Sequence, residues 1–331
     1  MKISGKSFFV TGADGFIGSH LVELLVKQGA KIKALVFYNS WNEIGWLKDI
    51  PKNILDNIEI IKGDVRDGDQ MQEIIRGCEF VMHLSSLIAI PYSYNAPRSY
   101  IDTNIIGTLN VLQGCRRSDN FTKLVHVSTS ETYGSAKFTP INESHPLSGQ
   151  SPYSASKIGA DKLVESFNLS FDLPVVTARP FNTFGPRQTA RAVIPTIASQ
   201  LASGNEEIKL GALSPTRDFN YVTDTAAGMI ELAITDDTNG EVINIGSGEE
   251  WSIKETVELL LKISGKNAKI VIDEVRLRPE NSEVDRLIAD NSKISKLTNW
   301  KSNVSFYDGL NYTYDWVEKN IHLFDANSYT R

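Results

Sequence analysis

The sequence has little cysteine, no long apolar run and no excess of positive charge. It contains 331 residues but only two cysteines, Cys78 and Cys115, which form neither a disulfide framework nor the spacing of a zinc site. We therefore expect two reduced, buried thiols and no metal. No stretch approaches the length of a membrane span, and no signal-peptide core precedes the first apolar strand. These absences predict a cytoplasmic protein without a membrane partner.

The charge balance argues against a nucleic-acid partner. Lys and Arg number 34 and Asp and Glu number 40, which gives a net charge of -6, whereas a nucleic-acid surface needs a basic face. Hydrophobic residues make up 41% of the chain, which is enough to bury a large core. The length predicts one large domain or two intimately joined domains. Local basic groups remain able to bind a phosphate.

Three glycines follow the first short apolar run. Residues 7–11 are predicted to form a buried strand, and Gly12, Gly15 and Gly18 come before an amphipathic helix. Such glycines permit a tight turn, close approach of the backbone to a pyrophosphate, and close packing of helix on strand. The helix N-terminus then faces the phosphates. The residues of this loop that we predict to bind a dinucleotide are Gly12, Gly15, Phe16, Ile17 and Gly18.

Apolar runs alternate with helical patterns through the first half of the chain. This alternation predicts an α/β fold with a doubly wound, parallel Rossmann sheet. After Arg179, many glycines and prolines separate shorter elements, which predicts a smaller substrate-binding domain. Strand character returns at 241–245, so part of 215–250 is expected to complete the sheet and the two domains are expected to interleave. We place the dinucleotide-binding domain at 1–180 and the mainly substrate-binding domain at 181–331. The predicted strands of the first half are 7–11, 31–37, 58–62, 80–84, 124–128 and 175–179.

Two Tyr-x-x-x-Lys pairs occur, and their surroundings separate them. Tyr153 and Lys157 follow a Ser-Pro pair typical of a helix start, so both side chains should share one helix face. Tyr133 and Lys137 are interrupted by Gly-Ser and a predicted loop. We therefore choose Tyr153 as the base for hydride transfer. The Lys157 ammonium and an oxidised nicotinamide are expected to lower the pKa of its phenol.

A second candidate base lies at the end of a predicted strand. Thr129, Ser130 and Glu131 follow residues 124–128, and open parallel sheets carry their chemistry at the carboxyl ends of strands. Capping of the strand end explains Thr129 and Ser130, but a carboxylate beside a tyrosine base is harder to explain in that way. The predicted catalytic residues are Thr129, Ser130, Glu131, Tyr153 and Lys157.

Together these motifs resemble extended short-chain dehydrogenase/reductases. The Gly-x-x-Gly-x-x-Gly spacing is typical of that family, and Thr-Ser-Glu at 129–131 resembles nucleotide-sugar 4,6-dehydratases of the GDP-mannose type. The resemblance implies that Tyr153 takes the C4 hydroxyl proton and Glu131 the C5 proton, that the C6 hydroxyl leaves as water, and that hydride returns to C6. Thr129 would hold the sugar oxygen. Ser130 stands where other dehydratases have an aspartic acid, which leaves its role open.

The resemblance also implies further cofactor contacts. NAD enzymes usually carry an acid after the second strand and NADP enzymes an arginine nearby, but residues 37–40 read Phe-Tyr-Asn-Ser and satisfy neither rule. We predict NAD because no arginine follows, and NADP stays open. Asp64 and Val65 resemble the adenine-edge contact. The implied contacts outside the glycine loop are Asn39, Asp64, Val65, Leu84, Ser85, Ser86 and Asn104, with Tyr153 and Lys157.

Arginine-bearing segments of the second half resemble the family's nucleotide-sugar contacts. Arg217 and Arg278 are predicted to clamp the diphosphate, because a guanidinium fork matches phosphate geometry. The predicted substrate-binding residues are Asn182, Arg187, Arg191, Val193, Arg217, Arg278 and Glu280.

The residues of three segments, 38–41, 89–94 and 188–196, look most like those of N-acetylglucosamine-nucleotide 4,6-dehydratases. UDP-N-acetylglucosamine is the first predicted substrate and GDP-N-acetylglucosamine the second. A nucleotide-sugar 4-epimerase is the alternative reaction, and a nonenzymatic dinucleotide sensor is a third class. Tyr92, Ser93 and Tyr94 either shape an acetamido pocket or form a plain loop. Members of this family commonly pair through the helices near Asn104 and Tyr153, so we expect a homodimer.

Overall fold

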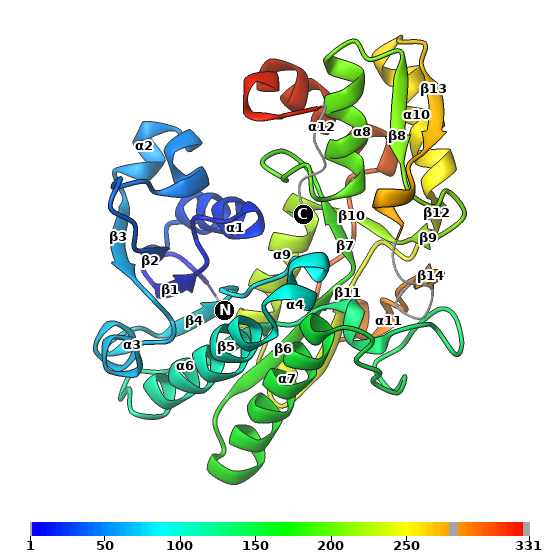
Figure 1. Ribbon diagram of the computed structural model, residues 1–331. Helices are drawn as coiled ribbons and strands as arrows, with labels where there is room; N and C mark the ends of the chain where they lie inside the picture. Colours follow the sequence, from blue (N-terminus) through cyan, green and yellow to red (C-terminus); the bar gives the residue numbers. More distant parts are fainter. Residues whose placement is uncertain (1, 278–283, 327–331) are drawn as a thin grey trace.

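The computed structural model describes residues 2–277 and 284–326 (Figure 1). Its centre is a sheet of seven strands, all of whose neighbours pair in parallel. The predicted α/β fold with a doubly wound Rossmann sheet is therefore confirmed, and the predicted strands differ from the observed ones by at most one residue at either end. In spatial order the strands are β11 (Val242–Ile245), β6 (Val175–Pro180), β5 (Lys123–Val127), β4 (Phe80–His83), β1 (Ser7–Thr11), β2 (Lys31–Phe37) and β3 (Ile58–Gly63).

Helices cover both faces of this sheet because its strands are apolar on both sides. Alternate side chains of β1 point to opposite cores: Phe8 and Val10 join one, and Phe9 joins the other. One face packs against α1 (Phe16–Lys27), α2 (Lys52–Leu55), α9 (Val222–Ile234) and α11 (Ser292–Leu297). The opposite face packs against α3 (Gly68–Ile75), α6 (Gly107–Arg116) and α7 (Pro152–Phe171).

A third core lies beyond the carboxyl ends of the strands, in the upper right of Figure 1. It contains α8 (Val193–Ala202), α10 (Ile253–Ser264) and α12 (Phe306–Lys319), and β8 (Glu207–Leu210) pairs there with β13 (Lys269–Ile272). Two smaller sheets connect it to the large one: β7 (Asn182–Phe184) with β10 (Phe219–Tyr221), and β9 (Thr216–Arg217) between β12 (Trp251–Ser252) and β14 (Arg286–Leu287).

One helical stretch beside the sheet changes its pitch. α5 (Pro97–Tyr100) continues through a π-helical turn, η2 (Ile101–Ile106), into α6. π-turns inside α-helices are rare and often occur at functional sites. This one carries Asn104, a predicted cofactor contact.

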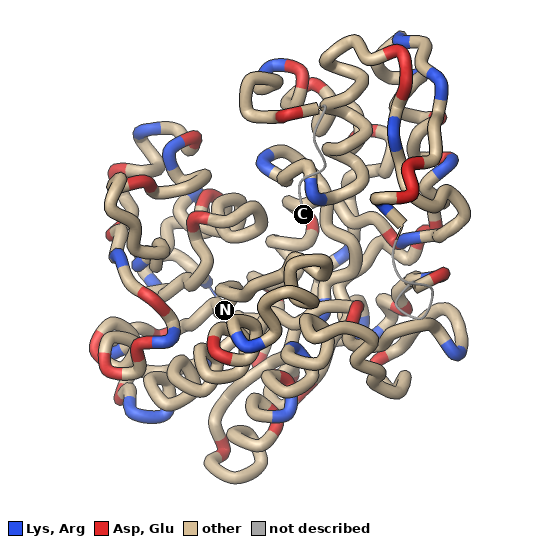
Figure 2. Tube along the Cα trace, viewed as in Figure 1, with Lys and Arg blue, Asp and Glu red and all other residues tan. Residues whose placement is uncertain are grey.

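Lys and Arg residues alternate with Asp and Glu residues along the chain in both the Rossmann part and the part that contains α8, α10 and α12 (Figure 2). Within residues 2–277 and 284–326, no group of His, Cys, Asp and Glu has the geometry of a metal site. Over the same residues, no helix has the length and apolarity needed to cross a membrane. Cys78 and Cys115 are both free and buried.

Candidate active site

The predicted strip of catalytic residues begins directly after β5. Ser130 opens a short 3-10 turn, η3 (Ser130–Tyr133), and Thr129 caps it by accepting a hydrogen bond from the Glu131 amide at 3.2 Å. Thr132 strengthens the turn by donating its hydroxyl to the Thr129 carbonyl at 2.8 Å. Ser130 is buried, whereas Thr129 and Glu131 are half-buried. The turn therefore holds a carboxylate at the carboxyl edge of the parallel sheet.

Tyr153 approaches this strip from the first turn of α7. Ser151 caps the helix in a reciprocal hydrogen-bond pair with Ser154, and Pro152 occupies the first helical position, as the sequence predicts. The side chain of Thr129 lies near enough to the Tyr153 hydroxyl to lower its pKa as a hydrogen-bonding partner. Burial raises the pKa of Tyr153 above its ordinary value; Thr129 opposes that rise, and the negative charge of Glu131 adds to it. The protein's own groups thus keep this phenol neutral, and forming the phenolate needs additional positive charge.

Lys157 lies one turn further along the same helix and is fully buried. Its ammonium donates to the Val127 carbonyl at 2.8 Å. Burial lowers its pKa from 10.5 to about 8, and the negative charge of Asp161 opposes this fall. The Lys157 ammonium is therefore mostly protonated at neutral pH, and its pKa depends on the charge of Asp161.

The competing pair at Tyr133 is structural. Tyr133 is buried in η3, donates its hydroxyl to Asn244 Oδ1 at 2.7 Å, and lies under the Arg179 guanidinium, 4.9 Å from the ring centre. Lys137 lies in an irregular segment after this turn. The helix-start argument that favoured Tyr153 thus agrees with the local structure.

The glycine loop is too tight for side chains at two of its glycines. Gly12 has φ +66°, and a Cβ there would lie 2.9 Å from the Ser85 amide. A Cβ at Gly18 would lie 2.0 Å from the Gly12 carbonyl oxygen, which fixes how closely α1 approaches the strand. Gly15 is the N-cap of α1 and provides no side-chain cap, so the first amides of the helix are available to an anion. The loop therefore fits a pyrophosphate, and Phe16 and Ile17 begin the helix beside it.

The segment predicted to contact the nicotinamide, Leu84 to Ser86, is hydrogen-bonded to the end of the first strand. Thr11 Oγ1 accepts hydrogen bonds from the amides of Leu84 and Ser85, at 3.1 and 3.0 Å. Ser86 follows in the same irregular segment after β4. Asn104 is buried in the π-turn, donates to Ser156 Oγ at 2.9 Å, and bonds both the amide and the carbonyl of Leu87. It thus joins the nicotinamide segment to the helix that carries Tyr153.

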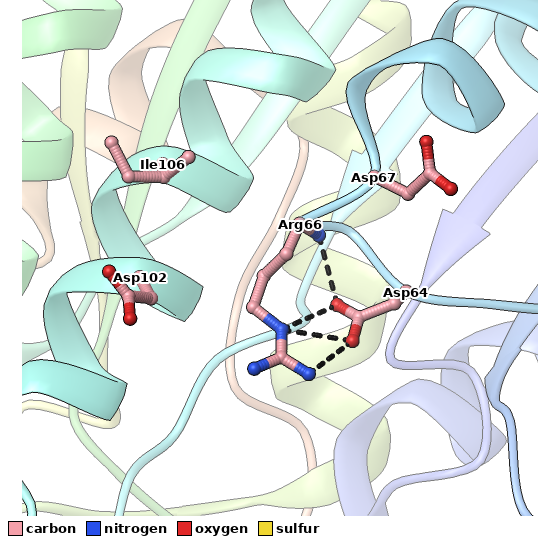
Figure 3. Close-up of a pocket in the computed structure, with 5 residues that line it drawn as sticks. All are labelled: Asp64, Arg66, Asp67, Asp102 and Ile106. Carbon is pink, nitrogen blue, oxygen red and sulfur yellow. Dashed lines mark hydrogen bonds and ion pairs between the residues drawn. The ribbon is translucent and has the colours of Figure 1, made fainter.

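The predicted adenine contact borders an open hollow of about 480 Å³ (Figure 3). Arg66 folds back onto Asp64, with its Nε 2.9 and 3.0 Å from the two carboxylate oxygens. Although burial opposes the shift, these bonds lower the pKa of Asp64. Val65 packs beside Gly107 of α6, and its carbonyl accepts from the Asn110 side chain at 3.0 Å. The hollow is lined by Asp64, Arg66, Asp67, Asp102 and Ile106.

The predicted substrate residues occupy different environments. Asn182 Oδ1 in β7 is buried and has no hydrogen-bond partner within the described part of the chain, and the same holds for Gln188 Oε1 six residues later. Buried acceptors of this kind are commonly satisfied by a ligand or by water. Arg191 is exposed just before α8, and Val193 is the first residue of that helix. Arg278 and Glu280 lie outside the described residues.

The two remaining arginines are already engaged with protein groups. Arg187, with φ +70°, pairs with Glu23 at 2.9 Å and bonds Ser19 Oγ at 3.3 Å, so its guanidinium contacts α1. Arg217 in β9 is buried and donates to the Thr216 carbonyl at 2.8 Å. Arg187 therefore connects the second half of the chain to the helix of the glycine loop.

Comparison with known proteins decides the family. Residues 9–313 match the model of the GDP-mannose 4,6 dehydratase family. The chain belongs to the GDP-mannose 4,6 dehydratase family. A low-salt glycan biosynthesis protein of Haloferax volcanii is 30% identical over 93% of this chain and 97% of its own length.

Solved structures agree with the family assignment. A UDP-N-acetylglucosamine 4-epimerase from Methanobrevibacter ruminantium, in complex with UDP-N-acetylmuramic acid, matches with a TM-score of 0.85 and 30% identity over 96% of this chain and 99% of that one. A double mutant of a dTDP-glucose 4,6-dehydratase from Streptomyces venezuelae, with NAD bound, matches with a TM-score of 0.84 and 27% identity over 96% and 98%. The solved structures similar to this chain thus carry both dehydratase and epimerase names.

These matches confirm the predicted enzyme class. The sequence motifs predict an extended short-chain dehydrogenase/reductase of the nucleotide-sugar dehydratase and epimerase type, and family membership agrees. The predicted cofactor agrees with the NAD named in several solved relatives. The particular sugar nucleotide and the roles of individual residues stay predictions.

The sequence did not lead us to predict the buried carboxylate of Asp161, which lies one helical turn after Lys157 in α7. Asp161 accepts from Ser128 Oγ and from Arg179 Nη2, both at 2.9 Å, and from His126 Nε2 at 3.2 Å. Burial raises the pKa of Asp161, but the hydrogen bond from His126 and the nearby charges of Arg179, His126 and Lys157 outweigh it and lower the pKa to about 2. The signal was present, because Asp161 follows Lys157 by four residues and thus shares its helix face.

His83 at the end of β4 forms a second buried link, between Thr11 at the end of β1 and Thr108 in α6. Thr11 Oγ1 already accepts two amides, so its own proton points to His83 Nδ1 at 2.8 Å. Thr108 donates its hydroxyl to the Asn104 carbonyl at 2.7 Å, so His83 Nε2 donates to Thr108 at 3.0 Å. This pattern requires a neutral imidazole, and burial lowers the pKa of His83 accordingly.

Proposed function

We propose that this protein is a UDP-N-acetylglucosamine 4,6-dehydratase that uses NAD. The observation that carries the proposal is Glu131, a half-buried carboxylate in the turn after β5, whose charge acts on Tyr153. A sugar 4-epimerase needs a base for the C4 hydroxyl only. A second base beside the first suits a reaction that also removes the proton at C5.

The proposed roles follow from the chemistry of dehydration. When bound, NAD accepts hydride from C4 and returns it to C6. Tyr153 accepts the proton of the C4 hydroxyl, with Thr129 holding the sugar oxygen and Lys157 supplying nearby positive charge. The resulting ketone acidifies C5, so Glu131 can remove the C5 proton while the C6 hydroxyl leaves as water. The net change is the loss of one water.

Ser130 bears on how the leaving hydroxyl receives its proton. A serine hydroxyl is too weak an acid to replace a carboxylic acid in this task. We therefore assign both proton steps to Glu131, with the proton passed to the C6 oxygen directly or through Ser130. After giving its first proton to the departing water, Glu131 takes a new proton from solvent and delivers it to C5.

The test is a product assay with UDP- and GDP-N-acetylglucosamine in deuterated water. The expected product is a UDP-4-keto-6-deoxy-N-acetylhexosamine that carries deuterium at C5, identified by mass spectrometry and NMR. A preference for the GDP substrate would move the assignment to GDP-N-acetylglucosamine 4,6-dehydratase. Unchanged substrate with every sugar nucleotide tried would sink the proposal.

A nucleotide-sugar 4-epimerase is the alternative function, because several solved structures similar to this chain are named epimerases. Glu131→Gln separates the two reactions because the amide cannot act as a base. The dehydratase proposal expects loss of water elimination by about 100-fold or more. A variant that still interconverts C4 epimers at the wild-type rate would support the epimerase.

Two further assignments belong to this proposal. We place the dinucleotide-binding domain at 1–180, completed by part of 215–250, and the nucleotide-sugar-binding domain mainly at 181–331. We also propose a homodimer formed through α6, the π-turn and α7, which is supported by exposed apolar side chains at Ile101, Ile106 and Leu169. Analytical ultracentrifugation should give a dimer that Leu169→Glu or Ile101→Glu dissociates; a wild-type monomer would rule the dimer out.

A further inference from the structure

The end of β2 contains no side chain that reads the adenosine ribose in the usual way. NAD-binding sheets commonly place an acid there, whereas this chain has Phe37 followed by Tyr38 and Asn39. Asn39 is occupied within its own loop: its Nδ2 donates to the carbonyls of Phe37 and Glu43, at 3.2 and 2.9 Å, and its Oδ1 accepts from the Glu43 amide at 2.9 Å. It braces the loop and has little capacity left for a ligand.

A carboxylate reaches this place from the glycine loop instead. Asp14 Oδ2 accepts a hydrogen bond from the Phe37 amide at 3.3 Å, which places it at the end of β2. Asp14 precedes the N-cap of α1, yet no side chain caps that helix, so its carboxylate has turned away from the helix and towards the strand.

The loop after β2 then closes over Asp14. The Trp46 amide donates to the Asp14 carbonyl at 2.9 Å. Gly45 has φ +56°, and a Cβ there would lie 2.4 Å from the same carbonyl oxygen. Asp14 is thus held between the predicted pyrophosphate loop and the end of the second strand, the two places that bracket an adenosine ribose in this fold.

We propose that Asp14 supplies the carboxylate that accepts the ribose 2'-hydroxyl of the dinucleotide, and that its charge excludes the 2'-phosphate of NADP. The inference rests on the dinucleotide part of the proposed function and extends it to cofactor selectivity. An ionised carboxylate has about four acceptor positions, and the Phe37 amide uses one of them. Acceptor capacity therefore remains for a ligand hydroxyl.

The surrounding charges agree with this assignment. Burial raises the pKa of Asp14, and the hydrogen bond from the Phe37 amide opposes the rise. Lys62, opposite Val36 in the sheet, is held by Asn42 Oδ1, and Arg66 is held by Asp64. The two cations of the neighbouring strand and loop are therefore occupied by protein partners, whereas a 2'-phosphate needs a cation able to receive it.

The experiment measures dissociation constants of NAD and NADP by calorimetry on the full chain, after removal of bound dinucleotide. The wild type should bind NAD more tightly. Asp14→Ala should weaken NAD by about 10- to 100-fold, the range for a hydrogen bond to a charged group, without weakening NADP. Asp14→Asn keeps an acceptor for the Phe37 amide but lacks the charge, so it should bind NADP more tightly and lose less NAD affinity than Asp14→Ala.

Matched variants separate selectivity from loop stability. Asp49→Asn removes an exposed carboxylate from the same segment and should leave the NADP-to-NAD ratio unchanged, while Asn39→Ala loosens the loop and should change both affinities together. Thermal unfolding of each variant checks folding. An unchanged ratio in Asp14→Asn, equal losses for both dinucleotides in Asp14→Ala, or a wild type that prefers NADP overturns the inference alone. A wild type that binds neither dinucleotide overturns the proposed function with it.

Discussion

The two halves of this molecule position their functional groups in different ways. In the first half, the glycine loop, Glu131 and Tyr153 lie at the end of a strand or the start of a helix within a β–α unit. In the second half, the arginines lie in short strands and loops and are oriented by distant partners, as Glu23 of α1 orients Arg187. Local sequence therefore specifies geometry in the first half, whereas the second half depends on how the two parts pack.

The strongest test of this difference compares the two Tyr-x-x-x-Lys tyrosines. Tyr153→Phe should reduce turnover by about 100- to 10,000-fold, because it removes the general base, and should leave thermal stability nearly unchanged. Tyr133→Phe should retain most of the turnover but lower stability by about 1 kcal/mol, because Asn244 loses its hydrogen-bond donor. Steady-state kinetics and thermal unfolding measure both. Comparable losses of turnover would show that the regular helix start does not determine the site.

A glycine pair tests whether close packing in the first half is essential. Gly18→Ala should destabilise the fold by about 3 kcal/mol and abolish dinucleotide binding, because its Cβ would lie 2.0 Å from the Gly12 carbonyl. Gly265→Ala, at φ +63° after α10 with no atom within 4 Å of the added Cβ, should cost only about 1 kcal/mol of backbone strain. Urea unfolding gives both values; equal losses would contradict the packing argument.

The pH dependence of turnover tests the buried group around Lys157. Turnover should fall as pH rises through about 8, because Lys157 loses its charge there. Asp161→Asn should move this alkaline limb to lower pH, since the anion that raises the pKa of Lys157 is gone, and Asp161→Glu should restore it. A rate loss without movement of the limb would reduce Asp161 to a packing role.

The lowered pKa of Lys157 also determines how the free energy of unfolding changes with pH. The pKa of Lys157 in the folded state is below its ordinary 10.5, so the unfolded chain binds more protons between about pH 8 and 10.5. Burying this lysine therefore costs stability fully below pH 8, and the cost fades as pH rises. The stability advantage of Lys157→Met over the wild type should shrink over that interval in urea unfolding at several pH values.

The smallest expected effect separates the two engaged arginines. Arg187→Met should weaken NAD binding and lower the unfolding temperature through its lost contact with α1, while the KM for the nucleotide sugar changes little. Arg217→Met should raise that KM by about tenfold, the loss of roughly one charged hydrogen bond. If Arg187→Met instead raises only the sugar-nucleotide KM, the sequence-based role of Arg187 holds and its pairing with Glu23 is incidental.

The strands, the glycine loop and the start of α7 could be predicted because their signals are local. Short, continuous apolar runs and a Ser-Pro helix start can be recognised without knowledge of tertiary contacts. Asp161 could have been included from its spacing to Lys157. The contact of Arg187 with α1 could not, because it depends on a left-handed backbone at Arg187 and on a helix far away in the sequence.

Asp14 shows the same limit at closer range. Residues 37–40, at the end of β2 and directly after it, contain no acidic side chain, as the sequence shows. Only the fold shows that a carboxylate from the preceding loop reaches the same point in space.

The π-turn at Ile101–Ile106 determines how the side chains of α6 are rotated about the helix axis relative to those of α5. Each residue rotates an α-helix by about 100°. A π-turn contains one extra residue, so the side chains that follow it point in directions rotated from those that a continuous α-helix would give them. Deleting one residue here would keep the chain helical but rotate α5 and α6 relative to one another. Asn104 and the apolar side chains at 101 and 106 would then no longer point in their present directions together, so this helix accepts substitutions far more readily than changes in length.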